Sequence, residues 1–276
     1  MKRMIYHALL VCVLLNFVSA QDLSYAVEND RIVGPTEITS NGYQPITLTN
    51  QTDNPVDVVF FRLKEGATLN AFKTALQAFY KVVGPQTEDV RPEVEAMMPL
   101  VDGYGGAQIA PSGESTIYVR LEPGTYDIEV SPIVGGDIYL SQTLTVTNGE
   151  KVSPPQADLS LHMADFQFDF PKALNAGPQL WKVSNTGEQP HFAYLYKLNK
   201  GVSTENFMTW MQTAGPESGP PPAEDADFIQ FLTAGQTFYK EVDLAAGNYV
   251  ALCFLPDLET NTPHVELGMI SSFTVQ

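Results

Sequence analysis

Four residues near the C-terminal end of the chain carry side chains that could together bind a metal ion. They are His191, Cys253, His264 and Met269. Two imidazoles, a thiolate and a thioether form the set of donors that copper favours in a trigonal electron-transfer site with a weak axial ligand. Zinc accepts the same nitrogen and sulfur donors, but a thioether ligand favours copper. The residue types therefore predict one copper ion in the second half of the chain.

Cysteine and histidine are rare in this chain, which has 2 cysteines and 4 histidines among 276 residues. One cysteine and one histidine fall in residues 1–20. In this segment Lys2 and Arg3 precede a mostly apolar run, and a small-residue cleavage pattern ends at Ala20. We expect this segment to be a signal peptide. Cys253 is then the only cysteine of the mature chain and cannot form an internal disulfide. Such a thiol implies intermolecular pairing, burial as a hydrophobic side chain, or metal binding.

The predicted signal peptide implies an exported protein, periplasmic or extracellular. A retained anchor is the alternative interpretation of residues 1–20, although their apolar run is short for the roughly 20 residues that span a bilayer. We expect no membrane span in the mature chain. The formal net charge of −17 argues against nucleic acid as a partner, because phosphates would be repelled. A redox partner or copper donor is expected, but the sequence does not identify it.

The fold class follows from short segments rich in Val, Ile, Thr, Phe and Tyr, which recur between Gly, Pro, Asn and Asp residues. This pattern predicts an all-β protein built as a β-sandwich or barrel. Helical periodicity is limited to residues 68–83 and 204–214, each with a polar start and an apolar stripe.

The two halves of the chain repeat one pattern. Asn50–Phe72 aligns without a gap with Asn185–Phe207, and Leu121–Val130 aligns with Leu244–Cys253. The same order of strand, turn, strand, helix, long loop and closing hairpin indicates two copies of one domain. We place the copies at residues 21–150 and 151–276, with a Pro- and Gly-containing linker near 148–156.

The first copy lacks the four donors. Val56 stands where His191 is, Val130 stands where Cys253 is, and Leu140 lies near the place of Met269. Because valine fills the same fold without a donor atom, the fold itself does not require cysteine or histidine. The first copy is therefore predicted to be a degenerate sandwich without metal ligands.

Each copy also contains a Pro/Gly-rich insertion after its helix, at Gly84–Gly106 and Gly215–Asp227. Proline lacks the amide donor that a central ladder needs, so we expect both insertions to stay out of the sheets. They would then cross the surface or one end of a sandwich, as decorative loops, site covers or contact surfaces.

Alternation along the strand that begins at Tyr249 puts Tyr249, Ala251 and Cys253 on one face. His191 begins another strand, and both His264 and Met269 lie on the connection to the final strand at 271–276. If that final strand neighbours the strand that begins at His191, all four donors meet at one end of the sandwich.

The second copy resembles the cupredoxin family of blue copper proteins over Asp158–Gln276. The resemblance is carried by the N-x-G-x-x-P-H run that ends at His191, followed in order by Cys253, His264 and Met269. It implies a Greek-key sandwich with copper near one end, three equatorial ligands in His191, Cys253 and His264, and Met269 as the axial ligand. More closely, the second copy looks like a group of exported bacterial cupredoxin-like domains.

One feature departs from the family pattern. Ten residues, Phe254–Pro263, separate Cys253 from His264, where family members usually have only a few. Closing a loop of about ten residues instead of three costs only about 1 kcal/mol more in chain entropy. The longer loop therefore permits the site, and Pro256 and Pro263 stiffen it.

The expected function is one-electron transfer or copper binding without catalysis. The alternative is a metal-free interaction or adhesion module, in which Cys253 is a core residue and the long loop carries His264 away from it. A Cys–His nucleophile pair lacks an evident orienting residue. Three histidines in the mature chain are too few for a multicopper oxidase or a two-domain nitrite reductase, and His162 is interpreted as structural.

Overall fold

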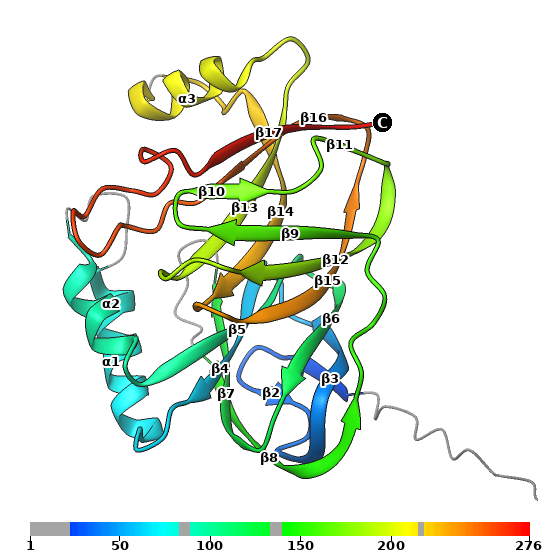
Figure 1. Ribbon diagram of the computed structural model, residues 1–276, viewed down its shortest axis with the longest axis vertical. Coiled ribbons are helices and arrows are strands. Elements are labelled where there is room, and N and C mark those ends of the chain that lie inside the picture. Colours follow the sequence, from blue (N-terminus) through cyan, green and yellow to red (C-terminus); the bar gives the residue numbers. More distant parts are fainter. Residues whose placement is uncertain (1–22, 83–88, 133–139, 215–217) are drawn as a thin grey trace, which may run out of the picture.

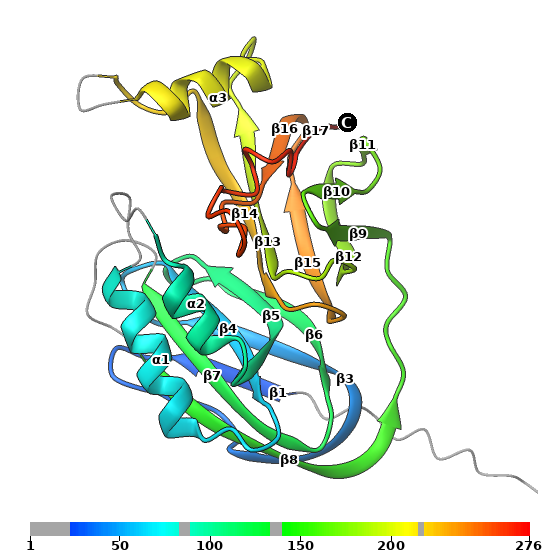
Figure 2. The same cartoon turned by 60° about the vertical axis from the view of Figure 1, so that its left-hand side comes forward.

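The computed structural model describes residues 23–82, 89–132, 140–214 and 218–276. The signal peptide predicted at residues 1–20 lies outside these ranges. Within them, none of the helices has the length and apolar character needed to cross a membrane. Two β-sandwiches follow one another along the chain and pack against each other, with the helices on their outer faces (Figure 1 and Figure 2).

The N-terminal sandwich consists of two sheets. In the first, β3 pairs with β1 in parallel and with β6 in antiparallel; in the second, β4 lies between β5 and β7, and β7 pairs with β8. The end of β8 also pairs with the start of β3, which joins the two sheets. The strands are β1 (Leu23–Val27), β2 (Ile32–Val33), β3 (Glu37–Asn50), β4 (Val56–Leu63), β5 (Val101–Ile109), β6 (Glu114–Leu121), β7 (Gly124–Pro132) and β8 (Leu140–Val152).

The C-terminal sandwich repeats this arrangement. Its first sheet has β12 between β9 and β15, and its second has the order β14, β13, β16, β17 and β11. The strands are β9 (Leu159–Ala164), β10 (Gln167–Asp169), β11 (Ala173–Leu174), β12 (Gly177–Asn185), β13 (His191–Leu198), β14 (Ala223–Leu232), β15 (Thr237–Leu244), β16 (Gly247–Leu252) and β17 (Ile270–Val275).

The strand register confirms that the two sandwiches are copies of one pattern. Phe60 faces Ile128 in the first, and the aligned residues Leu195 and Ala251 face each other in the second. Two further pairs agree in the same way. Gly42 pairs with Leu121 in the first sandwich, and the aligned residues Gly177 and Leu244 pair in the second. Tyr126 pairs with Leu144 in the first, and the aligned residues Tyr249 and Phe273 pair in the second. The predicted all-β class with tandem cupredoxin-like sandwiches is therefore correct. The division that we placed between residues 150 and 151 falls inside β8.

Equivalent asparagines shape the turn before the second sheet in both copies. The side-chain nitrogen of Asn50 donates to the carbonyl of Asn54 at 2.8 Å, and that of Asn185 donates to the carbonyl of Gln189 at 2.7 Å. Each asparagine also accepts the backbone N–H two residues later, which closes an Asx turn. In the second copy this turn delivers the chain to His191.

The helices partly match the expectation. Helix α1 (Leu69–Val82) and helix α3 (Thr204–Thr213) form where the periodicity predicted them, and Ser203 caps α3 by accepting the N–H of Asn206 at 3.1 Å. Helix α2 (Arg91–Met97) was not predicted, because it is short and lies in the Pro/Gly-rich insertion.

The prediction that both insertions stay out of the sheets is wrong for their C-terminal ends. Strand β5 begins at Val101 and pairs with β4 over its length, and β14 begins at Ala223 and pairs with β13. The physical reason is the position of the prolines. Pro99 and Pro222 both precede these strands, so the amides that the ladders need are intact.

The two sandwiches contact each other through paired strands. Phe238 of β15 pairs with Val119 of β6, and Leu232 of β14 pairs with Tyr104 of β5. Gly105 has a φ of 88° and lies so close to the Phe238 ring that a Cβ atom would come within 2.5 Å of it. A residue with a side chain would therefore force the two halves apart at this point.

Candidate metal centre

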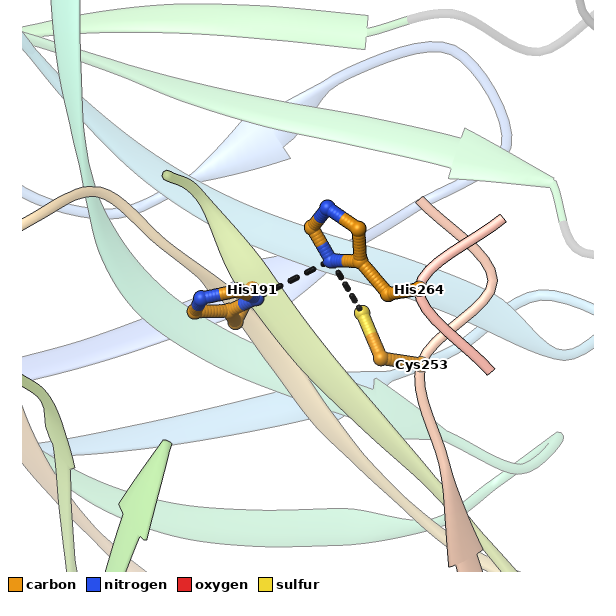
Figure 3. Close-up of side chains that lie close together, drawn as sticks. All are labelled: His191, Cys253 and His264. Atoms are coloured by element: carbon orange, nitrogen blue, oxygen red, sulfur yellow. Dashed lines mark hydrogen bonds between the residues drawn. The ribbon is translucent and has the colours of Figure 1, made fainter. Parts of the chain in front are cut away.

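The structure brings three of the four predicted donors together. His191 is the first residue of β13, Cys253 follows the last residue of β16, and His264 lies on the connection from β16 to β17. The ligand atoms of these three side chains all lie within 4.8 Å of one another (Figure 3). The condition that we set, that the final strand neighbours the strand beginning at His191, is not met, because β16 separates β17 from β13. The donors still meet, since the connection folds back over the end of β16.

Alternation along β16 explains why the thiol points into the site. Tyr249, Ala251 and Cys253 belong to the main core between the sheets, as predicted, whereas Val250 and Leu252 belong to the smaller cluster under α3. Both faces of the strand are covered, and Cys253 therefore projects between the sheets at the end of the sandwich.

The spacing of the donor atoms fits one metal ion. His191 Nδ1 and His264 Nδ1 are 3.1 Å apart, and His264 Nδ1 is 3.6 Å from Cys253 Sγ. With nitrogens about 2.0 Å and a sulfur about 2.3 Å from a common ion, at tetrahedral angles, the two nitrogens would be about 3.3 Å apart and a nitrogen and the sulfur about 3.5 Å apart. These two separations are thus close to those that a shared ion requires.

The thiol of Cys253 is fully buried. Burial raises the pKa of the Cys253 thiol to about 11, although the backbone N–H groups of Phe192 and Leu255 donate to the sulfur and oppose this rise. The thiol is therefore protonated at neutral pH and is a poor nucleophile. This argues against a Cys–His nucleophile pair, and it means that forming the thiolate requires a positive charge beside the sulfur.

An acidic side chain fixes the ring of His191. Its Nε2 lies 2.9 Å from Asp165 Oδ1, and Asp165 also accepts the backbone N–H groups of Glu188 and Gln189. Burial acts to raise the pKa of Asp165, but these hydrogen bonds outweigh it and lower the pKa. An ionised carboxylate can only accept, so the hydrogen of the neutral His191 ring is on Nε2 and Nδ1 has a free lone pair.

An amide oxygen holds the ring of His264 in the same way. Gln189 Oε1 lies 3.4 Å from His264 Nε2 and also accepts the N–H of Leu258 at 3.1 Å, while Gln189 Nε2 donates to Asp257 Oδ1 at 2.6 Å. Both contacts orient the amide with its oxygen toward the ring. This contact favours the tautomer of His264 with its hydrogen on Nε2, in which Nδ1 also has a free lone pair; with the hydrogen on Nδ1, His264 instead bonds to His191 Nδ1 at 3.1 Å.

The two Nδ1 atoms consequently face each other beside a buried sulfur. Burial, together with the charge that His191 would carry, lowers the pKa of His264 to about 4, and burial also lowers the pKa of His191. Both rings are neutral at pH 7. A cation among these atoms can take the place of the hydrogen that joins the two nitrogens and accept electron pairs from all three donors.

The ten-residue loop between Cys253 and His264 is well ordered. Pro256 and Pro263 form an isolated β-bridge, and Asp257 accepts both the N–H and the hydroxyl of Thr260, at 2.9 Å and 2.6 Å. The ends of the loop are tied as well, since the N–H of His264 donates to Leu255 at 2.8 Å. These bonds hold His264 in place despite the length of the loop.

Met269 is fully buried next to the other donors. Its N–H donates to the carbonyl of His264 at 2.8 Å, and its carbonyl accepts the N–H of Cys253 at 3.3 Å. The backbone of Met269 is therefore bonded to the backbones of two other donor residues. His162 lies on β9 and does not belong to the His–Cys–His group.

Residues that support the site were not predicted from the sequence. Asp165 lies in the turn between β9 and β10, and no spacing rule connects it to His191. Gln189 lies two residues before His191, inside the run that carries the family resemblance, and could have been recognised there. Phe166, whose ring packs edge-on against His264 with centroids 5.2 Å apart, was also missed.

The metal-free alternative required His264 to point to solvent, away from the sulfur. His264 is instead 0% exposed, and its ring lies beside Cys253 (Figure 3). This condition of the alternative is therefore not met.

Comparisons with known proteins find similar solved structures but no matching family model and no matching curated protein. Auracyanin B shares 18% identity, with 45% of this chain and 94% of that chain covered and a TM-score of 0.29. Auracyanin A, a blue copper protein of Chloroflexus aurantiacus, shares 19% identity over 42% of this chain and 98% of its own, with a TM-score of 0.26. A multicopper oxidase shares 13% identity over 92% of this chain and 88% of that chain, with a TM-score of 0.26. The assignment of the fold itself rests on the strand pairing described above.

Proposed function

We propose that this protein binds one copper ion through His191, Cys253 and His264, with Met269 as a weak axial ligand, and that it carries single electrons. The observation that supports this most is the convergence of two Nδ1 atoms and one buried sulfur. The description of auracyanin A as a blue copper protein agrees with this proposal. Bound copper would supply the exchange between Cu(I) and Cu(II).

The protein contributes by holding the donors in one arrangement. Asp165 and Gln189 orient the two imidazoles from outside the site, so that each ring presents Nδ1. The N–H groups of Phe192 and Leu255 stabilise negative charge on the sulfur of Cys253 once its proton has left. Because these contacts are fixed by the fold, the donors need little movement when one electron arrives or leaves.

Burial of the donors favours a carrier over an enzyme. His191, Cys253, His264 and Met269 are each 0% exposed, so a substrate has no open position at which to reach the ion. We therefore propose a non-catalytic role, with the first sandwich serving packing or recognition. We further propose that residues 1–20 direct export, and that the mature chain acts in the periplasm or outside the cell.

Titration of the chain from Gln21 with Cu(II) tests the proposal. We expect a blue product with one copper per chain, because the thiolate of Cys253 gives strong charge transfer to Cu(II). Zn(II) should compete for the same site and give a colourless product. A colourless protein with only weak, substoichiometric copper would reject the proposed function.

A further inference from the structure

A pocket of about 180 Å³ lies between the two sandwiches, and residues of α1 and α2 are among those that line it. Its walls from the first half include Val59, Phe61 and Met97, and its walls from the second half include Phe192 and Leu255. These side chains are aliphatic or aromatic. The pocket is therefore suited to an apolar group, and both halves of the chain are needed to form it.

The size of the pocket limits what it can hold. An apolar cavity of about 150 Å³ accommodates a molecule the size of benzene. The volume of about 180 Å³ found here therefore fits one six-membered ring with a short substituent, or an aliphatic chain of similar bulk. A cofactor with several fused rings exceeds this volume.

One wall of the pocket carries a negative charge. Asp57 lines it, and its Oδ1 accepts from the side-chain nitrogen of Gln230 at 2.9 Å and from that of Gln108 at 3.4 Å. Burial raises the pKa of Asp57 to about 6, so at pH 7 its carboxylate is mostly ionised. Lys240, the buried cation that acts on Asp57, is bonded directly to Asp227, and among the described residues Asp57 has no ion-pair partner of its own.

We propose that this pocket binds a small organic amine, with its single ring or short chain between the two halves and its ammonium group on Asp57. The apolar walls would supply the hydrophobic contact, and the carboxylate would supply both charge and a hydrogen-bond acceptor. A neutral or anionic molecule of the same shape would lack the charge attraction to Asp57. The pocket is thus selective for cations.

The pocket is connected to the candidate metal centre through two residues. Phe192 and Leu255 line it with their side chains, and their backbone N–H groups donate to the sulfur of Cys253. A bound amine that shifts either residue changes these hydrogen bonds. Under the proposed copper function, on which this step rests, the charge-transfer band of the copper form moves when the pocket is occupied.

Calorimetric titration of the metal-free chain with benzylamine, benzoate and toluene tests the pocket without any use of copper. We expect benzylamine to bind at least tenfold more tightly than either of the other two. The variant Asp57→Asn should lose at least tenfold in benzylamine affinity, and Asp243→Asn, which changes an exposed carboxylate elsewhere, should lose nothing. Equal binding of toluene and benzylamine, or an unchanged affinity in Asp57→Asn, would overturn the proposal.

A second variant separates loss of the pocket from loss of folding. Val59→Phe fills the pocket from its first-half wall and should abolish benzylamine binding, while the circular dichroism spectrum stays that of the wild type.

Adding benzylamine to the blue copper form should then shift its visible band in the wild type but not in Val59→Phe. A colourless copper form with intact benzylamine binding would reject the copper function alone. Saturation of the blue form with benzylamine without a band shift would overturn the connection between the two sites.

Discussion

The Nδ1 atoms of His191 and His264 lie 3.1 Å apart, and the Nε2 atoms of the two rings are held by Asp165 and Gln189. In the metal-free protein a hydrogen on one Nδ1 joins the two rings. A cation that replaces this hydrogen gains three ligands. The folded state should therefore bind the ion far more tightly than the unfolded chain does, and the ion should stabilise the fold.

The first prediction concerns this stabilisation. Free Cu(II) at about a thousand times its dissociation constant should raise the free energy of unfolding by about 4 kcal/mol. The melting temperature should rise with copper concentration in a calorimetric scan. Magnesium, which prefers oxygen ligands, serves as the control and should leave it unchanged. An identical rise with magnesium would mean that copper acts elsewhere.

Replacing the thiol tests the central ligand. Cys253→Ser should abolish the blue colour with the protein still folded, because a hydroxyl does not replace the thiolate as a charge-transfer donor. Val130→Ser is the matched control, since Val130 occupies the equivalent buried position of the first sandwich. It should cost roughly 1–3 kcal/mol of stability and keep the colour. Metal content equal to that of the wild type in Cys253→Ser would show that the sulfur is not a ligand.

The carboxylate behind His191 should tune copper affinity. The charge of Asp165 orients the His191 ring and makes it more basic. Asp165→Asn removes this charge, so copper affinity should fall by about 10–100-fold. Asp169→Asn on the same hairpin is exposed and should have no effect. Competition with a chelator of known affinity measures both. If the two variants retain equal affinity, Asp165 does not act on the site.

The contact between Gln189 and Asp257 should control the loop. Gln189→Leu keeps the bulk but loses the bonds to Asp257, Leu258 and His264. Copper should dissociate faster, and proteases should cut within Phe254–Pro263 more readily. Asn54→Leu changes the equivalent turn of the first sandwich and provides the control. Unchanged copper release in Gln189→Leu would contradict this role.

A buried acid in the first half should give the stability a pH dependence of its own. Burial, with a smaller contribution from Asp127, raises the pKa of Glu129 to about 8. The folded state therefore holds a proton that the unfolded state releases near the ordinary pKa of about 4.3, and stability falls as the pH rises from about 4.3 through about 8. Glu129→Gln should remove this loss, so its melting temperature should exceed that of the wild type at pH 8.5 more than at pH 5. A constant difference between the two proteins over this range would refute the assignment.

The repeat, the fold class and the residue types that gather at the end of the second sandwich could be predicted because each depends on local pattern. Alternation placed Cys253 on the core face of β16, and the aligned sequences indicated one order of elements in both halves. The order of the last strands could not be predicted, because pairing of β17 with β16 instead of β13 is a tertiary choice.

The support of the site escaped prediction for a similar reason. Asp165 approaches His191 only because the β9–β10 turn folds over the end of the sandwich, and the sequence distance between them carries no signal. The order of the loop before His264 depends on Gln189, which belongs to a different strand connection. The pocket between the halves depends on how the two copies pack, which neither copy encodes alone.

The X-ray absorption spectrum at the copper edge tests the copper site most directly, because it reports which atoms surround the ion. For the protein loaded with one copper per chain, we predict one sulfur at about 2.2–2.3 Å and two nitrogens at about 2.0 Å. A shell of nitrogen and oxygen alone, the same in the wild type and in Cys253→Ser, would contradict it.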